Sequence, residues 1–451
     1  MIILKKWFDG VRQTVSPPRF ILYILTSLIV GGSLLLTLPI MTNSGQWTPL
    51  LDALFTATSA LCVTGQVTLN TMEHWNYLGR TVIIILIEIG GLGFMTLWTS
   101  LFIVLGRRVD MNQFKIMQES LNVESISDIV PVTRYIVYFS FAVQFIGATL
   151  LSIDFIPRLG LAKGIYYSLF HAISAYCNAG FDLFGDSMIG FQDNPLVLTV
   201  IMLLIISGGL GFIVWRDLLT YRRNRRLLIH TKIVLILTAT LLIGGTILFI
   251  LAQWGTHPFG KQAWYTSLLN YLFLSVTPRT AGYANIDYSL LKPASIFLTM
   301  ILMFIGGASG STAGGMKITT VFVIGLYAVR SLQRQDISIF KRSISAEIVN
   351  KAVFMLISGL LVIATGSFIL LMTETIPPGF GIEYLLMETF SCFGTVGLTM
   401  GMTPFLTGFG KFTLIVMMLI GRMGLLTFFW SFAPKSIEKN IHYPKTNILV
   451  G

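Results

Sequence analysis

Long apolar runs alternate with short polar breaks along almost the whole chain. Seven runs of about 20 apolar residues lie at about 20–40, 78–105, 134–156, 196–220, 229–252, 350–373 and 408–432. An eighth, at about 293–329, is broken near its middle. Each run is long enough to cross a bilayer as a helix. The pattern therefore predicts eight transmembrane helices, with both ends of the chain on the same side.

Four shorter apolar runs lie between the long ones, and each follows a short stretch that contains polar residues or proline. They have about ten to twelve residues and lie at 52–61, 165–176, 264–276 and 384–393. Runs of this length fit re-entrant helices that enter the membrane and turn back. Each stops at a small-residue loop with one glycine, and a second glycine cluster follows 24 to 28 residues later. The loops end in Thr64-Gly65, Ala179-Gly180, Ala281-Gly282 and Val396-Gly397.

This repetition predicts an all-α integral membrane fold. Four copies of helix, re-entrant pore loop and helix would surround one pore, with four pore helices besides the eight transmembrane helices. Irregular backbone at membrane depth is tolerated where it lines a water-filled cavity, which places the four loops around the pore axis. We divide the chain into pore repeats 17–105, 131–220, 229–330, whose second helix is broken, and 350–433, with tails 1–16 and 434–451.

Composition and charge agree with a membrane protein. The residues are 54% hydrophobic and only 11% charged, with a mean hydropathy of +0.77, which excludes an ordinary soluble domain. Of the 31 Lys and Arg, 23 fall on segments that share a side with the N-terminus and 7 on the opposite segments. The positive-inside rule then predicts that both termini are cytoplasmic. It also accounts for the net charge of +11, so we expect no nucleic-acid partner.

The remaining charges indicate what the two faces contact. Ten of the 20 acidic residues fall on the outer segments, where they would concentrate cations at the pore mouth. The inner charge is densest over 222–226, a cluster suited to anionic lipid or to a cytosolic partner. The chain has five scattered histidines, no His-Glu-x-x-His motif and no cysteine pair placed for a metal, so we expect no enzyme.

A cation filter explains the glycines at the loop ends. Removing water from K⁺ requires a ring of carbonyl oxygens in its place, and several successive carbonyls must face one axis. Such backbone needs positive φ, which glycine adopts without penalty. Glycines that only let helices pack closely are the alternative, and this explains the downstream clusters better than the loops. The predicted filter residues are Val63, Thr64, Gly65, Asn178, Ala179, Gly180, Thr280, Ala281, Gly282, Thr395, Val396 and Gly397.

The broken eighth run predicts a gate. It holds five glycines within 306–315, and each costs about 1 kcal/mol relative to alanine in a helix interior, so the segment should unwind. Arg422, a charged residue in another span, offers donors suited to the freed loop carbonyls. We expect a plug beneath the filter that opens when a cytosolic partner pulls on residues 317–334. Its predicted residues are Gly306, Gly307, Ser309, Gly310, Ser311, Thr312, Gly314, Gly315 and Arg422.

Several of these motifs resemble one family. The most specific is Thr277-Pro-Arg-Thr-Ala-Gly282, and it is joined by Asp52-Ala-Leu-Phe-Thr-Ala before Val63-Thr-Gly65, by Phe393-Gly-Thr-Val-Gly-Leu-Thr399 and by Ile89-Gly-Gly-Leu-Gly-Phe94. They are similar to the Trk/Ktr/HKT superfamily of potassium transporters, most of all to the membrane subunit of bacterial Ktr systems. The resemblance covers about 17–444.

The resemblance implies potassium uptake across the plasma membrane through a selectivity filter. It assigns the filter glycines to Gly65, Gly180, Gly282 and Gly397, and the intramembrane gating loop with its companion arginine to 306–315 and Arg422. Glycine at the first filter position goes with potassium preference. The resemblance also implies a homodimer on a cytosolic ring of regulatory subunits that bind ATP, ADP or NAD. It implies no cofactor in this chain, K⁺ as the transported ion and Na⁺ as an activator.

Three residues depart from the family pattern. Cys62 stands where the family usually has Thr, Gln66 where it has Leu, and Glu88 where it often has Gln. Glu88 is a candidate for ion passage or gating, or it is protonated and hydrogen-bonded, or solvated near the membrane edge. Two other functions remain open: a coupled Na⁺/K⁺ symporter or other secondary cation transporter, and a sodium-permeable relative. The K⁺-binding subunit of an ATP-driven pump resembles this superfamily, but it would be longer and would need a separate ATPase.

Overall fold

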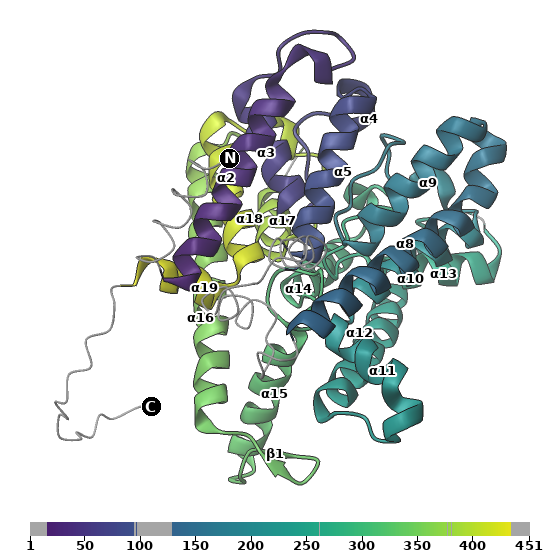
Figure 1. The fold of residues 1–451 in the computed structure, drawn as a ribbon. Coiled ribbons are helices and arrows are strands. Elements are labelled where there is room, and N and C mark those ends of the chain that lie inside the picture. Colours follow the sequence, from purple (N-terminus) through teal and green to yellow (C-terminus); the bar gives the residue numbers. More distant parts are fainter. Residues whose placement is uncertain are drawn as a thin grey trace.

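The computed structural model describes residues 16–93, 96, 129–260, 262–376, 378–379 and 381–433. Helices arranged around a common centre make up most of this part of the chain (Figure 1). The strands β1 (Ser338–Ile339) and β2 (Arg342–Ser343) form a short antiparallel hairpin. Single turns of 3-10 helix lie at 39–41, 189–191, 288–290 and 403–405.

Each repeat begins with a long apolar helix. These helices are α2 (Pro17–Thr37), α8 (Ile129–Leu159), α12 (Ile229–Ala252) and α16 (Ala346–Thr373). All four are long and apolar enough to cross a membrane. They also leave large apolar side chains uncovered, among them Phe145 at 72% exposure and Phe368 at 65%. Such apolar surface is typical of contact with lipid rather than water.

The short apolar runs form the expected second kind of helix. They are α3 (Leu50–Leu61), α9 (Leu161–Tyr176), α13 (Trp264–Val276) and α17 (Ile382–Gly394). Their last turns are largely buried, as at Ala60, Tyr176 and Phe273. The predicted pore helices are confirmed as helices, and each leads directly into one of the glycine loops.

Four helices follow the loops: α5 (Tyr77–Leu92), α10 (Pro195–Gly209), α14 (Pro293–Phe304) and α18 (Gly408–Met423). Except for α14, they end or turn where the apolar pattern predicted continuous spans. The chain turns by 95° between α10 and α11 (Phe212–Asn224) and by 107° between α18 and α19 (Leu425–Phe432). Continuous spans over 196–220 and 408–432 are therefore wrong. By length and composition, the described residues provide four unbroken spans, or up to six if each bent pair is one span.

A single glycine with positive φ makes each of these turns possible. Gly211 has φ 91° and ψ 146°, and Gly424 has φ 82° and ψ 144°. Gly93 ends α5 in nearly the same conformation, with φ 80° and ψ 131°. Other residues rarely adopt this backbone, which explains why glycine stands at all three breaks. The rest of the expected span 78–105 lies outside the described residues, apart from Thr96.

The second helix of the third repeat is broken more widely, as expected. It ends at Phe304 and resumes as α15 (Ile318–Leu332), and residues 305–317 between them form a loop that is called the break loop below.

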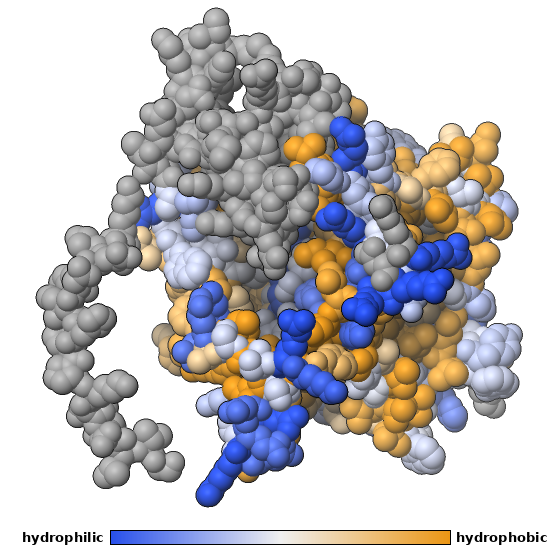
Figure 2. Space-filling model, turned by 60° about the horizontal axis from the view of Figure 1, so that its bottom comes forward, coloured by the Kyte–Doolittle hydropathy of each residue, from blue (hydrophilic) through white to orange (hydrophobic). Residues whose placement is uncertain are grey.

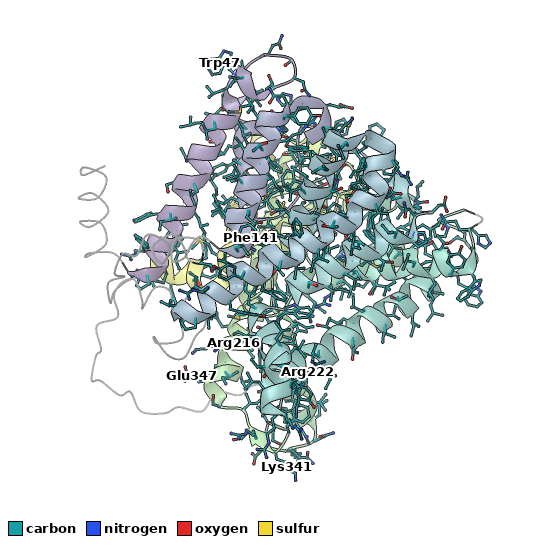
Figure 3. The ribbon with its side chains drawn as sticks, turned by 45° about the vertical axis from the view of Figure 1, so that its right-hand side comes forward. Trp47, Phe141, Arg216, Arg222, Lys341 and Glu347 are labelled. Carbon is teal, nitrogen blue, oxygen red and sulfur yellow. The ribbon has the colours of Figure 1, made fainter. Side chains whose placement is uncertain are left out.

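The two ends of the molecule differ in charge. Helix α4 (Thr71–His74) lies at the top in Figure 1, whereas α11, α15 and β1 lie at the bottom. Figure 3 places Trp47 at the top, Phe141 at mid-height, and Arg216, Arg222 and Lys341 at the bottom. When the bottom is turned forward, hydrophilic residues gather on it beside hydrophobic surface (Figure 2). The basic end agrees with the side that the positive-inside rule assigned to the cytoplasm.

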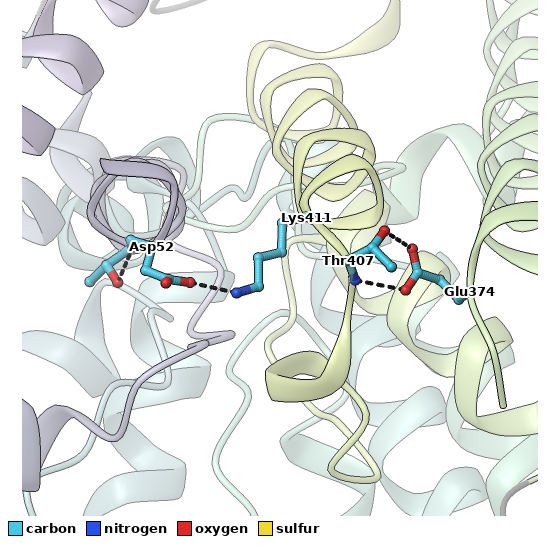
Figure 4. A network of polar contacts seen from close by, with 5 residues as sticks. Asp52, Glu374, Thr407 and Lys411 are labelled. Carbon is cyan, nitrogen blue, oxygen red and sulfur yellow. Dashed lines mark hydrogen bonds and ion pairs between the residues drawn. The ribbon is translucent and has the colours of Figure 1, made fainter. Parts of the chain in front are cut away.

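Polar contacts brace the opposite end of the molecule (Figure 4). Lys411 of α18 pairs with Asp52 of the first pore helix at 2.6 Å, which joins the fourth repeat to the first. Glu374, at the end of α16, accepts hydrogen bonds from the backbone N and the Oγ1 of Thr407, the residue that caps α18. The side chains of Lys411 and Asp52 are only 15% and 14% exposed, so neither charge is fully hydrated.

Candidate functional site: an ion pathway

Four loops with one backbone pattern follow the four pore helices. Each predicted filter segment has three residues. The first and the last of them have positive φ, and the middle one does not. The values are 59° and 92° at Val63 and Gly65, 61° and 68° at Asn178 and Gly180, 73° and 77° at Thr280 and Gly282, and 50° and 97° at Thr395 and Gly397. The four loops thus share one backbone pattern, with left-handed residues at their first and last positions. We call these four segments the filter loops.

Hydroxyl residues at the ends of the pore helices hold the filter loops. The carbonyl oxygens of Ser59, Ser174 and Ser391 each accept, at 2.8 Å, the amide N–H of the residue before the loop glycine. The Ser59 and Ser391 hydroxyls also accept the N–H of Gly65 at 3.0 Å and of Gly397 at 2.9 Å. These serines were not among the residues predicted from the sequence. The sequence pattern that could have revealed them is a serine six positions before the filter glycine in three of the four repeats.

The third filter loop is held by a threonine instead. The Thr277 carbonyl oxygen accepts the N–H of Ala281 at 3.0 Å, and its hydroxyl donates to the Tyr283 carbonyl at 2.6 Å. The backbone amides of all four loops therefore point back into the pore helices. This leaves their carbonyl oxygens free to point the other way.

The four loops meet in a closed ring. A Cβ added to Gly180 would lie 2.6 Å from the carbonyl oxygen of Ala281, and one added to Gly282 would overlap the carbonyl of Val396. In the same way Gly397 faces the Thr64 carbonyl, and Gly65 faces the Ala179 carbonyl. Each glycine is thus pressed against the carbonyl of the next repeat, and the order returns to the first repeat after the fourth. A side chain at any of the four positions would collide with its neighbour.

The carbonyl oxygens of the filter loops have no protein partner. Within the described part of the chain, none of the twelve filter carbonyls accepts a hydrogen bond. The loops are nevertheless enclosed: Thr64, Ala179, Ala281 and Val396 have 0% exposure. Buried backbone carbonyls are normally paired, and leaving them unpaired costs free energy. A ring of such oxygens is the arrangement that replaces the water shell of a cation.

The break loop lies against the inner ends of the pore helices, beside the filter. Gly314 packs so closely on the Thr395 side chain that a Cβ would overlap it. The Thr312 hydroxyl donates to the Tyr176 carbonyl at 3.2 Å, where α9 ends. The amide of Thr312 donates to Gly208, and that of Gly315 to Gly421, both at 3.3 Å. The second, third and fourth repeats thus meet at this loop.

Arg422 adds the first repeat to these contacts. Its Nη1 donates to the carbonyl oxygen of Thr312 in the break loop. Its Nη2 donates to the carbonyls of Gly90 and Gly91 at the end of α5, the latter at 3.3 Å. The expected contact between Arg422 and a loop carbonyl is therefore present. The contact with α5 was not expected, because no sequence pattern pairs residues more than 330 positions apart.

Arg422 occupies the place of a repeated glycine. Gly90-Gly91 and Gly208-Gly209 are followed two positions later by the glycines that break α5 and α10, whereas the fourth repeat has Gly421-Arg422 before Gly424. The first glycine of each pair packs on a pore-helix end: a Cβ on Gly90, Gly208 or Gly421 would overlap the carbonyl of Leu61, Tyr176 or Phe393. The downstream glycines thus serve close packing, and only the fourth repeat places a cation beside them.

Glu88 is paired with neutral groups behind the second filter loop. Its Oε2 accepts a hydrogen bond from Nε2 of Gln144 at 2.9 Å and lies 3.3 Å from the Cys177 thiol. Of the three roles considered for Glu88, the hydrogen-bonded one is the role that the geometry matches. Cys62 is buried and carries a free thiol, and so do Cys177 and Cys392. Among the described residues, no group of three or more His, Cys, Asp and Glu is placed to hold a metal ion.

The fold and the site together define a multi-pass helical membrane protein with a central pore of four re-entrant loops. The chain belongs to the TrkH family of cation transport proteins, whose family model matches residues 16–441. This confirms the resemblance found in the sequence. The members of this family are transporters rather than enzymes.

Individual relatives agree over nearly the full length. The chain is 46% identical to the Potassium/sodium uptake protein NtpJ of Enterococcus hirae, with 100% of both chains covered. It is 40% identical to the Ktr system potassium uptake protein B of Bacillus subtilis, with 97% of both covered. Its fold is similar to the crystal structure of the potassium transporter TrkH from Vibrio parahaemolyticus, with a TM-score of 0.71 and 19% identity over 92% of this chain and 84% of that one.

Proposed function

We propose that this chain takes up potassium ions through the ring of filter loops. The observation that carries the proposal is the set of twelve filter carbonyls without a protein partner in the described part of the chain, ten of them on buried residues. Four loops contribute them around one axis, so an ion in the ring meets several oxygens at each level, as K⁺ requires on losing its water. The names of the relatives, which include potassium uptake proteins, support K⁺ as the ion.

The break loop and Arg422 form the gate in this proposal. The loop lies where an ion leaving the filter inward would pass, and it is hydrogen-bonded to the second and fourth repeats. Arg422 holds the loop in the closed position by joining it to α5. A pull on α15, which begins directly after the loop, would withdraw the plug.

A cytosolic regulatory ring supplies that pull, and the chain works as a homodimer in the plasma membrane with both termini inside. The ring binds ATP, ADP or NAD. Relatives named as parts of a Ktr system support a multi-component assembly. Arg222 lies at the bottom of the molecule (Figure 3), and it is exposed together with Arg225 and Arg226, which suits an acidic or polar partner surface. Neutralising these arginines should weaken co-purification of the ring and leave the membrane dimer intact.

Coupled sodium and potassium transport is the second candidate. One relative is named a potassium/sodium uptake protein, which favours a role for Na⁺ as driving ion, activator or second permeant ion. The two mechanisms differ in stoichiometry. A pore passes K⁺ down its own gradient, whereas a symporter needs both ions.

Ion flux into liposomes tests the proposal. The purified protein would be reconstituted, and rubidium and sodium entry measured with and without an opposing sodium gradient. A potassium pore predicts rubidium entry that continues when the sodium gradient is reversed. Entry that follows the sodium gradient would establish coupling, and absence of rubidium entry under all conditions would contradict potassium uptake.

A further inference from the structure

A buried carboxylate lies behind the filter. Glu388 of the pore helix α17 has 0% exposure and stands nine positions before the filter glycine Gly397. Its Oε2 accepts hydrogen bonds from Nε2 of Gln66 at 2.7 Å and from the Thr403 hydroxyl at 2.8 Å. Its Oε1 accepts one from the Thr399 hydroxyl. The carboxylate is thus joined to the chain that leaves two different filter loops.

Gln66 is the link to the first filter loop. It follows Gly65 directly and is only 1% exposed. Besides donating to Glu388, its Oε1 accepts the Cys392 thiol at 2.6 Å. Both ends of the Gln66 amide are therefore fixed by α17 of the fourth repeat. This fastens the outer end of the first filter loop to the neighbouring repeat, at the boundary where the ring of loops closes.

The charge on Glu388 has no cationic partner among the described residues. Its donors are the side-chain amide of Gln66 and the hydroxyls of Thr399 and Thr403. A carboxyl that only accepts hydrogen bonds is in the ionised form. A buried charge is retained at low cost only when another charge compensates it. A cation in the filter is the compensating charge that the position of Glu388 offers.

We infer that Glu388 and Gln66 set the potassium affinity and selectivity of the filter: Glu388 attracts the ion by its charge, and Gln66 fixes the outer end of the first filter loop. This inference rests on the proposed potassium pathway. Glu388 acts through its charge rather than as a ligand, because both of its oxygens already accept hydrogen bonds from Gln66, Thr399 and Thr403. Two different effects follow from the two residues. Loss of the charge weakens ion binding, whereas loss of the tether loosens the ring and its preference.

The test uses the full chain in liposomes and measures rubidium flux against external concentration, with sodium as competitor. Glu388→Gln keeps the size of the side chain and removes its charge, so the half-saturating concentration should rise about tenfold with a smaller change in maximal rate. Glu388→Asp keeps the charge and should restore most of the affinity. Gln66→Leu keeps the charge of Glu388 and removes the tether, so it should lower the preference for rubidium over sodium more than it lowers affinity.

The matched control is Glu374→Gln, another buried carboxylate that braces α16 and α18 outside the filter. It should leave half-saturation and selectivity at the parent values. Glu388→Gln and Gln66→Leu proteins that assemble and show parent affinity and preference would overturn the inference. If Glu388→Gln does not assemble, Gln66→Leu and Thr403→Val decide the question by the same criteria. If Gly65→Ser changes selectivity while these variants do not, only this inference fails; if the parent passes no rubidium, the proposed pathway itself fails.

Discussion

The filter loops and the break loop are both rich in glycine and lie next to each other at the centre of the molecule. They differ in whether their backbone carbonyls accept hydrogen bonds from the protein. None of the filter carbonyls accepts a hydrogen bond from the described residues. In the break loop, by contrast, the carbonyls of Gly307, Gly310, Thr312 and Ala313 accept donors from the protein. Free carbonyls are available to an ion, whereas paired carbonyls fix a shape.

This difference explains how two glycine-rich segments serve different purposes. In the filter, positive φ at Gly65 and its counterparts aims the oxygens inward, and the serines at the pore-helix ends bind the amides. In the break loop, Lys317 donates to the Ala313 carbonyl at 2.6 Å and Arg422 donates to that of Thr312. Opening the plug would require these bonds to be exchanged for water or for other partners. We therefore expect substitutions in the two regions to change flux in opposite directions.

The largest effect should come from adding a side chain to the ring. Gly282→Ala would place a Cβ against the Val396 carbonyl, at a φ of 77° that costs about 1–2 kcal/mol for an L-residue. Rubidium flux should fall about tenfold or more, because one displaced carbonyl disturbs the whole ring. Gly244→Ala is the control, since open space surrounds Gly244. Equal flux in both variants would place the pathway elsewhere.

Releasing the plug should raise rubidium flux, the opposite of the effect expected for Gly282→Ala. Arg422→Ala removes the contacts to Thr312 and to Gly90, so basal rubidium flux should rise about tenfold, equivalent to about 1.4 kcal/mol. The rise should be accompanied by weaker dependence on the regulatory partner. Deleting Ser309 to Ala313 should act in the same direction. Assembled variants that conduct no more than the parent would reduce the break loop to a packing feature.

Gly65→Ser should change selectivity as well as rate. A serine would press on the Ala179 carbonyl and alter the spacing of the oxygens, lowering the preference for rubidium over sodium about threefold to tenfold. Competition between the two ions in the liposome assay measures this ratio. Gly31→Ser, in open space on α2, serves as the control. An unchanged ratio in a membrane-inserted Gly65→Ser protein would remove Gly65 from the filter.

The smallest effect on transport should come from the brace that lies outside both regions. Lys411→Met breaks the ion pair with Asp52 and leaves a carboxylate that is only 14% exposed. Stability should fall by about 1–2 kcal/mol, seen as a lower thermal unfolding midpoint in detergent. Selectivity and basal flux per folded protein should stay at the parent values. A changed ratio of rubidium to sodium flux would mean that this ion pair also shapes the filter, which would contradict its place outside both regions.

Local signals in the sequence were enough to predict the repeats, the pore helices, the loop glycines and the wide break after α14. Run length and glycine spacing carry that information within a few residues. The turns at Gly211 and Gly424 escaped prediction, because one glycine in an apolar run is also compatible with an unbroken helix. The predicted domain boundaries and the roles of the site residues stay predictions.

Contacts between the first and fourth repeats could not be predicted from the sequence. Gln66 and Glu388 are 322 positions apart, and Arg422 and Gly90 are 332 apart. Neither pair shows a periodic pattern, since each contact exists only because the fourth repeat closes the ring against the first. The serines that hold the filter loops were predictable only in part. Their spacing to the glycines is regular, but a serine on an apolar helix often bonds only to the backbone of its own helix, and the fold is needed to show that these serines hold the loops.

The most direct test of the central claim is an experimental structure of the protein in rubidium, with the ion located by its anomalous scattering. The account predicts density on the axis of the ring, enclosed by the carbonyl oxygens of Thr64, Ala179, Ala281 and Val396. Soaking in sodium in place of rubidium should weaken or shift it. A protein that transports rubidium but places it away from these four carbonyls would contradict the account.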